Sequence, residues 1–179
     1  MQQQIDTVYN PSPFLPQQPL ANISMSDRGL SKSGTLTEVH DYVNAIVLNK
    51  AGEALIMEGS PDGRGWASWH MIGRNIQLGE DPILAVQQDL LERTGYKSNQ
   101  WLFLGAYTID HNQPTGAGYF FCAHKIYQVM PLVSPHENLR LKWVTKKELK
   151  QALLDGRIAV INHAIAAYMA LTLCELAAD

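Results

Sequence analysis

Two acidic side chains, Asp89 and Glu92, are spaced so that they lie side by side on one face of a helix. Neighbouring carboxylates suit a hard cation such as Mg²⁺, with phosphate oxygens completing its coordination shell. Arg93, four residues after Asp89, sets a fixed positive charge against that face. The alternative is a solvated surface whose ion pair is worth about 0.3–0.5 kcal/mol.

The ends of this helix are marked in the sequence. Asp81 followed by Pro82 is typical of a helix start, and Gly95 of a helix end. Helical spacing predicts one buried side, made of Ile83, Val86, Leu90 and Leu91. The opposite arc is predicted to carry Ala85, Gln88, Asp89 and Glu92, with Arg93 at its edge.

The segment 73–96 resembles the box of the Nudix hydrolases, GX5EX7REUXEEXGU with U aliphatic, which forms a loop, a helix and a loop. Glu80, Glu92 and Gly95 match that pattern, and the spacing is preserved. Four positions depart from it: Arg74 replaces the first glycine, Gln88 the arginine, Asp89 the next glutamate and Arg93 the last glutamate.

The resemblance implies a chemistry, namely attack of metal-activated water on an organic diphosphate. It implies that Asp89, Glu92 and Glu80 hold Mg²⁺ or Mn²⁺, and that Glu92 takes part in catalysis. In ADP-ribose pyrophosphatases the base lies in the loop before the strand that matches residues 139–144, and Glu137 occupies that place. The alternative for Glu137 is an exposed loop acid without a catalytic role.

The departures predict altered use of the metal. A guanidinium at position 93 repels cations, so we expect weak metal binding. Arginine can instead hold a phosphate directly, which predicts that Arg74 and Arg93 contact the substrate. Gln88 and Trp69 complete the predicted substrate-binding residues; for Trp69, stacking on a base competes with an ordinary place in the core.

Outside the box, the chain is most similar to the ADP-ribose pyrophosphatase branch of that family. Two features carry this similarity. The first is the C-terminal end, where residues 139–145 are followed by a helix, by Asp155-Gly156-Arg157-Ile158 and by an alanine-rich helix. The second is a stretch before the first core strand, which resembles the N-terminal strands that this branch often uses for dimer contact. Glu58 and Gly59 stand where that branch usually carries basic and amide residues, which argues against ADP-ribose itself.

The whole chain has 179 residues and a formal net charge of −3, with no basic run, which argues against nucleic acid as a partner. No segment reaches the roughly 20 apolar residues of a membrane span, so we expect no membrane partner and a cytoplasmic protein. Cys122 and Cys174 lie far apart without metal-ligand spacing, which predicts reduced thiols in the core.

Residues 1–35 differ in composition from the rest and are rich in proline and glutamine. This pattern predicts an extended arm ahead of a Nudix-like domain at 36–179. Phe14 and Leu15 are candidates to dock the arm on a second copy, so we expect a homodimer; a disordered tail is the alternative.

The pattern of elements predicts an α+β fold, a Nudix-type αβα sandwich with mixed sheets. Residues 43–48 and 54–57 are predicted to pair as a hairpin around 49–53. Further predicted strands cover 66–71, 101–109, 119–126 and 139–144, and further helices 146–154 and 162–176.

Three functions remain open from the sequence. The first is a Nudix-type hydrolase of a nucleoside diphosphate-linked compound or another small organic diphosphate. The second is a non-catalytic domain that binds a nucleotide or anionic metabolite. The third is an isomerase or cyclase on the same scaffold, since fold alone does not decide function.

Overall fold

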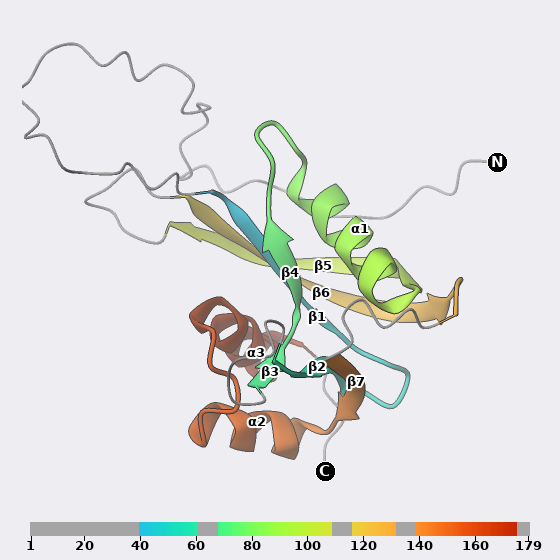
Figure 1. Ribbon diagram of the computed structural model, residues 1–179, viewed down its shortest axis with the longest axis vertical. Coiled ribbons are helices and arrows are strands. Elements are labelled where there is room, and N and C mark those ends of the chain that lie inside the picture. The colour runs from blue at the N-terminus through green and yellow to red at the C-terminus, as the bar shows by residue number, and fades with distance from the viewer. Residues whose placement is uncertain (1–39, 61–67, 109–115, 132–138, 175–179) are drawn as a thin grey trace, which may run out of the picture.

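The computed structural model describes residues 40–60, 68–108, 116–131 and 139–174. Within them, two sheets are packed with three helices in a mixed α+β fold (Figure 1). The predicted fold class is therefore confirmed. None of the helices in this part of the chain is long and apolar enough to cross a membrane. The predicted arm at 1–35 lies outside the described residues.

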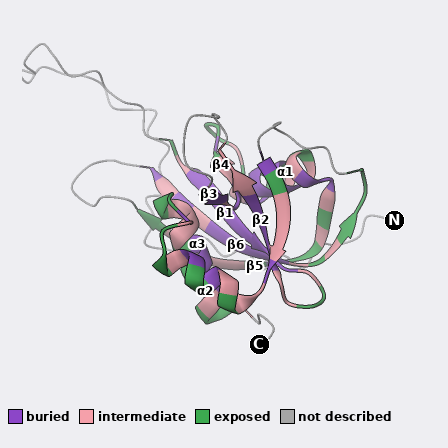
Figure 2. Cartoon of the chain, turned by 60° about the horizontal axis from the view of Figure 1, so that its bottom comes forward, coloured by how far each residue is buried: buried purple, intermediate pink, exposed green. Residues whose placement is uncertain are grey.

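The larger sheet has the order β4-β1-β6-β5, made of Ile72–Asn75, Tyr42–Val47, Ala117–Gln128 and Tyr96–Thr108. β1 runs parallel to β6 and antiparallel to β4, and β5 is antiparallel to β6. Every residue of β1 is buried (Figure 2), which is typical of a strand covered on both faces.

Two cores meet at β1, because alternate strand residues point to opposite faces. Val43, Ala45 and Val47 join the core that contains residues of α1 (Pro82–Thr94). Tyr42 and Ile46 join the core that contains residues of α3 (Ile161–Leu173). The larger sheet therefore lies between α1 and α3.

The smaller sheet has the order β3-β2-β7, made of Ser68–His70, Ala54–Gly59 and Leu139–Val144. α2 (Lys146–Leu154) follows β7 directly, and its start is fixed by a capping box of Thr145 and Glu148. The bounds of β7 and α2 agree with those predicted from the sequence.

The prediction that residues 43–48 and 54–57 pair as the two strands of a hairpin is wrong. The turn itself exists, since Asn49 N–H donates to the Glu53 carbonyl over 3.0 Å and a single bridge joins Leu48 to Ala54. Beyond that bridge β1 and β2 belong to different sheets. Each strand finds better-matched partners elsewhere: β6 and β4 for β1, and β7 and β3 for β2.

The strand predicted at 66–71 corresponds to β3, and the strand that follows it, β4, was not predicted. Ser68–His70 pairs with β2, whereas Ile72–Asn75 pairs with β1, so the chain changes sheets at Met71. Met71 is buried where the two sheets meet, and β4 then leads into the loop before α1.

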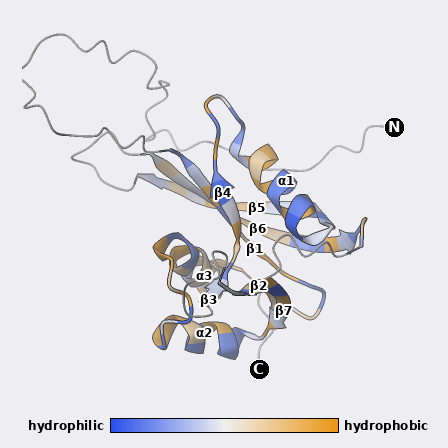
Figure 3. Ribbon diagram, viewed as in Figure 1, coloured by the Kyte–Doolittle hydropathy of each residue, from blue (hydrophilic) through white to orange (hydrophobic). Residues whose placement is uncertain are grey.

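The predicted exposed arc of α1 needs correction. Figure 3 shows both hydrophobic and hydrophilic residues along α1, with the hydrophobic colour concentrated near its start. Gln88 and Glu92 are exposed as expected, but Ala85 and Asp89 are buried. The buried face is wider than predicted because α1 packs against β4 and β1 as well as β5.

Candidate functional site

α1 is held at both ends by the residues that predicted it. The Asp81 side chain accepts a hydrogen bond from the Ile83 N–H over 3.0 Å, with Pro82 at the first helical position. At the other end Gly95 adopts φ 72°, and its N–H donates to the Leu91 carbonyl over 2.9 Å. This helix therefore has a fixed length and a fixed start beside the loop at 76–81.

Asp89 joins α1 to the strand in front of it. Its Oδ2 accepts a hydrogen bond from the Gly73 N–H over 2.8 Å, and its Oδ1 accepts one from Arg93 Nε over 2.8 Å. The side chain of Asp89 is only 4% exposed, so both of its oxygens are occupied within the protein. A Cβ on Gly73 would lie 2.0 Å from Asn44 Nδ2, so glycine is required for this close approach.

Arg74 and Glu80 form a second ion pair across the loop. The guanidinium meets the carboxylate with two nitrogens, one of them Nη1 at 2.9 Å from Oε2, and both side chains are 22% exposed. The hydrogen bonds from Arg74 and then from the Gln77 N–H lower the pKa of Glu80. The pKa of Arg74 is raised first by Glu80, and Asp89 and Glu92 add to it through their charge.

Glu92 and Gln88 lie on the exposed side of the helix, where Gln88 Nε2 donates to Glu92 Oε1 over 2.7 Å. Glu92 therefore keeps one carboxylate oxygen without a partner from this contact. The predicted substrate-binding and metal-binding residues Arg74, Glu80, Gln88, Asp89, Glu92 and Arg93 share the β4 end, the loop and α1.

As arranged, the acids of this site do not fit a divalent cation. Both oxygens of Asp89 and of Glu80 accept hydrogen bonds from within the protein. Among the residues that the structure describes, one group of three His, Cys, Asp or Glu side chains has ligand atoms within 4.8 Å of one another, and it contains none of these acids. The metal role of Asp89, Glu92 and Glu80 stays a prediction.

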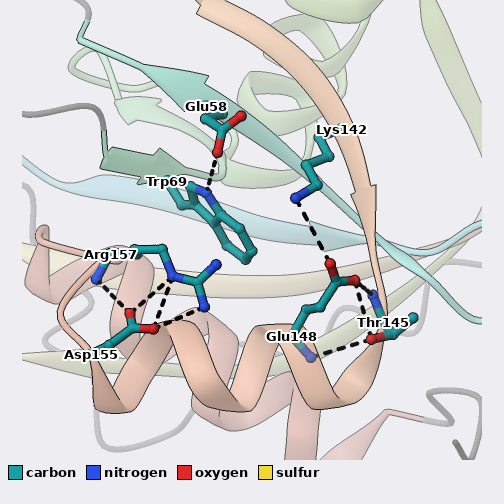
Figure 4. A network of polar contacts seen from close by, with 7 residues as sticks. All are labelled: Glu58, Trp69, Lys142, Thr145, Glu148, Asp155 and Arg157. Carbon is teal, nitrogen blue, oxygen red and sulfur yellow. Dashed lines mark hydrogen bonds and ion pairs between the residues drawn. The ribbon is translucent and has the colours of Figure 1, made fainter.

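Trp69 is enclosed by charged side chains (Figure 4). Its indole Nε1 donates to Glu58 Oε1 over 3.0 Å, and the ring is 1% exposed. The guanidinium carbon of Arg157 lies 4.3 Å from the ring centroid, and Lys142 Nζ lies 5.1 Å from it. Stacking of a substrate on Trp69 stays a prediction, and it requires one of these cations to move.

Two histidines near Arg93 were not singled out from the sequence. The rings of His70 and His163 meet edge to face with centroids 5.6 Å apart. Burial first, and then the charges of His70 and Arg93, lower the pKa of His163 to about 4. Burial is also the main cause that lowers the pKa of His70. The signal available in the sequence was weak, namely a histidine three residues before Gly73.

A family model of the NUDIX domain matches residues 38–163, which is most of the chain. The chain belongs to the Nudix family. No curated protein matches it in sequence.

Solved structures of Nudix proteins share its fold at low sequence identity. A structure of an ADP compounds hydrolase is 14% identical with a TM-score of 0.59, over 73% of this chain and 71% of that one. A NUDIX hydrolase from Nitrosomonas europaea is 20% identical with a TM-score of 0.54, over 74% of this chain and 90% of that one. A MutT structure, from work on Aliivibrio salmonicida and Vibrio cholerae, is 16% identical with a TM-score of 0.50, over 64% and 86%.

In this Nudix chain, two departures from the box are arginines paired with box acids. Arg93 neutralises Asp89, and Arg74 neutralises Glu80. Gln88, which stands in place of the box arginine, contacts Glu92 instead of forming a charged pair. At these positions the structure therefore holds two ion pairs, Arg74 with Glu80 and Arg93 with Asp89.

Two other features bear on the Nudix site. Glu137, the predicted base, lies outside the described residues, in the segment between β6 and β7. A hollow of about 390 Å³ lies instead beside the start of α3, where Tyr42, Tyr107 and Phe120 line it. These aromatic residues are away from the acids of α1, so the hollow does not by itself extend the site.

Proposed function

We propose that this protein is a Nudix-type hydrolase of a nucleoside diphosphate-linked compound or another small organic diphosphate. Family membership supports the reaction class. The observation that carries the substrate class is the presence of two guanidinium groups, Arg74 on β4 and Arg93 in the last turn of α1. Arg93 binds Asp89 directly, and Arg74 follows Gly73, whose N–H binds the same carboxylate. A diphosphate offers these groups the planar, two-point contact that arginine prefers.

The two arginines differ in what a bound phosphate would displace. Arg74 and Glu80 are both partly exposed, so a phosphate competes with a carboxylate that water also reaches. Arg93 is 28% exposed but its partner Asp89 is buried, so it keeps that contact and presents its remaining nitrogens. We therefore assign the larger rearrangement to Arg74.

Hydrolysis needs a base to take a proton from the attacking water, and our candidates are Glu137 and Glu92. Glu92 is exposed on α1 with one oxygen free of the Gln88 contact. Glu137 is the better match to the family's base by its place in the sequence.

Mg²⁺ or Mn²⁺ is the cofactor that the family implies, and we expect it to bind weakly before the substrate. Asp89 and Glu80 already have positive partners, and Mg²⁺ gives up its waters reluctantly. We expect millimolar rather than micromolar affinity, which calorimetry on the chain without substrate measures.

A second function is favoured by the same ion pairs. If neither Asp89 nor Glu80 takes up a metal ion, the domain binds a nucleotide or anionic metabolite without cleaving it. This reading keeps Arg74 and Arg93 as the contacts and removes the need for a base. We propose that the protein acts in the cytoplasm, whether it hydrolyses such a small molecule or only binds it.

The test is a panel of nucleoside diphosphate compounds, with and without Mg²⁺ or Mn²⁺, read by phosphate release after phosphatase treatment and by thermal shift. Turnover that Arg74→Ala weakens and Lys150→Ala leaves unchanged supports hydrolysis. Lys150→Ala is the control because, like Arg74→Ala, it removes one positive charge, but from the exposed side of α2. A thermal shift without turnover supports the binding function. The absence of both turnover and a thermal shift contradicts both functions.

A further inference from the structure

A second group of chemically active side chains lies on the other side of the larger sheet from α1. Cys122 and His124 occupy alternate positions of β6, so they point to the same face. Cys174 follows the last residue of α3, which packs against that face. The sequence did not reveal this group because Cys174 follows Cys122 only after β7, α2 and α3.

The three ligand atoms converge. Cys122 Sγ lies 3.2 Å from His124 Nε2, and the two sulfurs and a ring nitrogen all lie within 4.8 Å of one another. Both cysteines are free thiols in this structure. In a tetrahedral zinc site, ligand bonds of about 2.0–2.3 Å place neighbouring ligand atoms about 3.5–3.8 Å apart. The Sγ–Nε2 separation is slightly shorter than this, and no pair of the three ligand atoms is more than 4.8 Å apart, so small side-chain movements suffice to hold the cation.

The surroundings fix each of these residues. Cys122 is fully buried in the core formed with Ala166, Ala167 and Ala170 of α3. The Cys174 N–H donates to the Ala170 carbonyl over 3.1 Å, which fixes the end of the helix. Ser98 Oγ donates to the His124 carbonyl over 2.6 Å, which fixes the strand next to the ring.

We propose that Cys122, His124 and Cys174 form a binding site for Zn²⁺. Two thiolates and one imidazole are the ligands that this cation prefers, and they are poorly suited to Mg²⁺. His124 also lines a hollow of about 550 Å³, which neither cysteine lines, and water or another donor would have to supply the fourth ligand. The bound cation connects the end of α3 to β6 and stabilises the domain, because a site of this kind exists only in the folded chain.

The contact between the two thiols shifts their pKa in opposite directions, upward for Cys122 and downward for Cys174. Binding of Zn²⁺ would therefore have to release a proton from Cys122. A thiolate is the form of cysteine that binds metals. The site is separate from the acids of α1, so it does not depend on the proposed hydrolysis.

The test uses the full chain, without a histidine tag, reduced and freed of metal, and titrated with Co²⁺ and then Zn²⁺. We expect one equivalent of Co²⁺ to give sulfur-to-cobalt charge-transfer absorption and tetrahedral d–d bands, which Zn²⁺ abolishes. Zn²⁺ should also raise Tm. Cys174→Ser and His124→Gln should each weaken binding at least about tenfold, since loss of even an outer-shell partner has such an effect.

Thr172→Ala is the matched control, because Thr172 is exposed on the last turn of α3 and carries no ligand. It should leave the affinity for Zn²⁺ unchanged. Cys174 and His124 are only partly buried, so their variants are expected to fold, which circular dichroism checks.

Absence of the cobalt bands in the reduced chain would overturn the proposal, as would equal affinity in the wild type and both ligand variants. A Cys122–Cys174 disulfide in the purified chain, detected as a mass lower by two hydrogens, together with no metal binding after reduction, would assign the pair to redox chemistry instead.

Discussion

At the scale of single residues, Asp89 decides what the site can do. The spacing placed it on an exposed arc, but its carboxylate is buried and holds the Gly73 N–H and Arg93. A buried carboxylate keeps its charge only where donors surround it, and sequence spacing does not reveal those donors. Arg93 therefore has a structural role whatever ligand it contacts.

Arg93→Glu should destabilise the fold, because it removes the cation from Asp89 and adds a second carboxylate beside it. We expect a loss of about 2–4 kcal/mol, below the full value for a buried pair because Arg93 is partly exposed. Urea unfolding measures this loss. Lys97→Glu, at an exposed position of β5, is the control for charge alone and should change stability little. Equal effects of the two variants would contradict the role given to Asp89.

His163 predicts a dependence of stability on pH. The unfolded chain takes up a proton on this residue near pH 6.5, whereas the folded chain does so only near pH 4. The contribution of the neutral His163 side chain to the free energy of unfolding is therefore complete above about pH 6.5. It is lost as the pH falls toward 4, and the loss is at most about 3 kcal/mol. His70 acts in the same direction, since its pKa is also lowered.

Denaturant unfolding between pH 4 and 7 tests this prediction. His163→Gln should flatten the decline relative to the wild type, and His40→Gln, at an exposed position before β1, should not. A wild-type decline that His163→Gln leaves unchanged would assign the effect to other groups.

At the scale of elements, α1 was predicted well because its signals are local. A capping aspartate, a proline and a terminal glycine determine the ends of a helix without help from the rest of the fold. The bounds of β7 and α2 also agreed with the prediction. The hairpin of β1 and β2 was wrong because pairing between strands depends on distant partners, which one sequence does not identify.

Asp81→Ala should reduce the stability of the fold by about 1 kcal/mol, because it removes the acceptor for the Ile83 N–H. Asp81→Asn keeps an acceptor at the same place and should lose much less. Thermal unfolding of both variants measures the difference. Equal losses would mean that charge at the helix start matters more than the hydrogen bond.

At the scale of the whole molecule, composition and the box predicted the fold class, and the family match agrees with it. The Cys122, His124 and Cys174 cluster was not predicted, because it forms only when α3 packs on β6. The sequence spacing of the cysteines even argued against a metal site. Contacts between distant segments are the part of this molecule that local patterns could not supply.

The arm at 1–35 is expected to hold two copies together, since Phe14 and Leu15 would otherwise expose apolar groups to water. Deletion of residues 1–35 should shift a homodimer toward monomer, measured by light scattering at several concentrations. Phe14→Ser with Leu15→Ser in the full chain is the matched variant and should act in the same direction. An oligomer unchanged by both variants would remove the arm from the interface.

We propose that Arg93 and Gln88 set the metal affinity of the Nudix box, and calorimetric titration with Mn²⁺ is the experiment that tests this proposal. Gln88→Arg combined with Arg93→Glu restores the charges of the family pattern, so Asp89, Glu92 and the new carboxylate would lie within about one helical turn. We predict millimolar affinity in the wild type and much tighter binding in the double variant, with Mn²⁺ raising Tm of that variant. Lys97→Glu, which changes charge elsewhere, should bind as the wild type does. Micromolar binding of Mn²⁺ by the wild type would contradict this proposal, as would a folded double variant that binds Mn²⁺ no more tightly than the wild type.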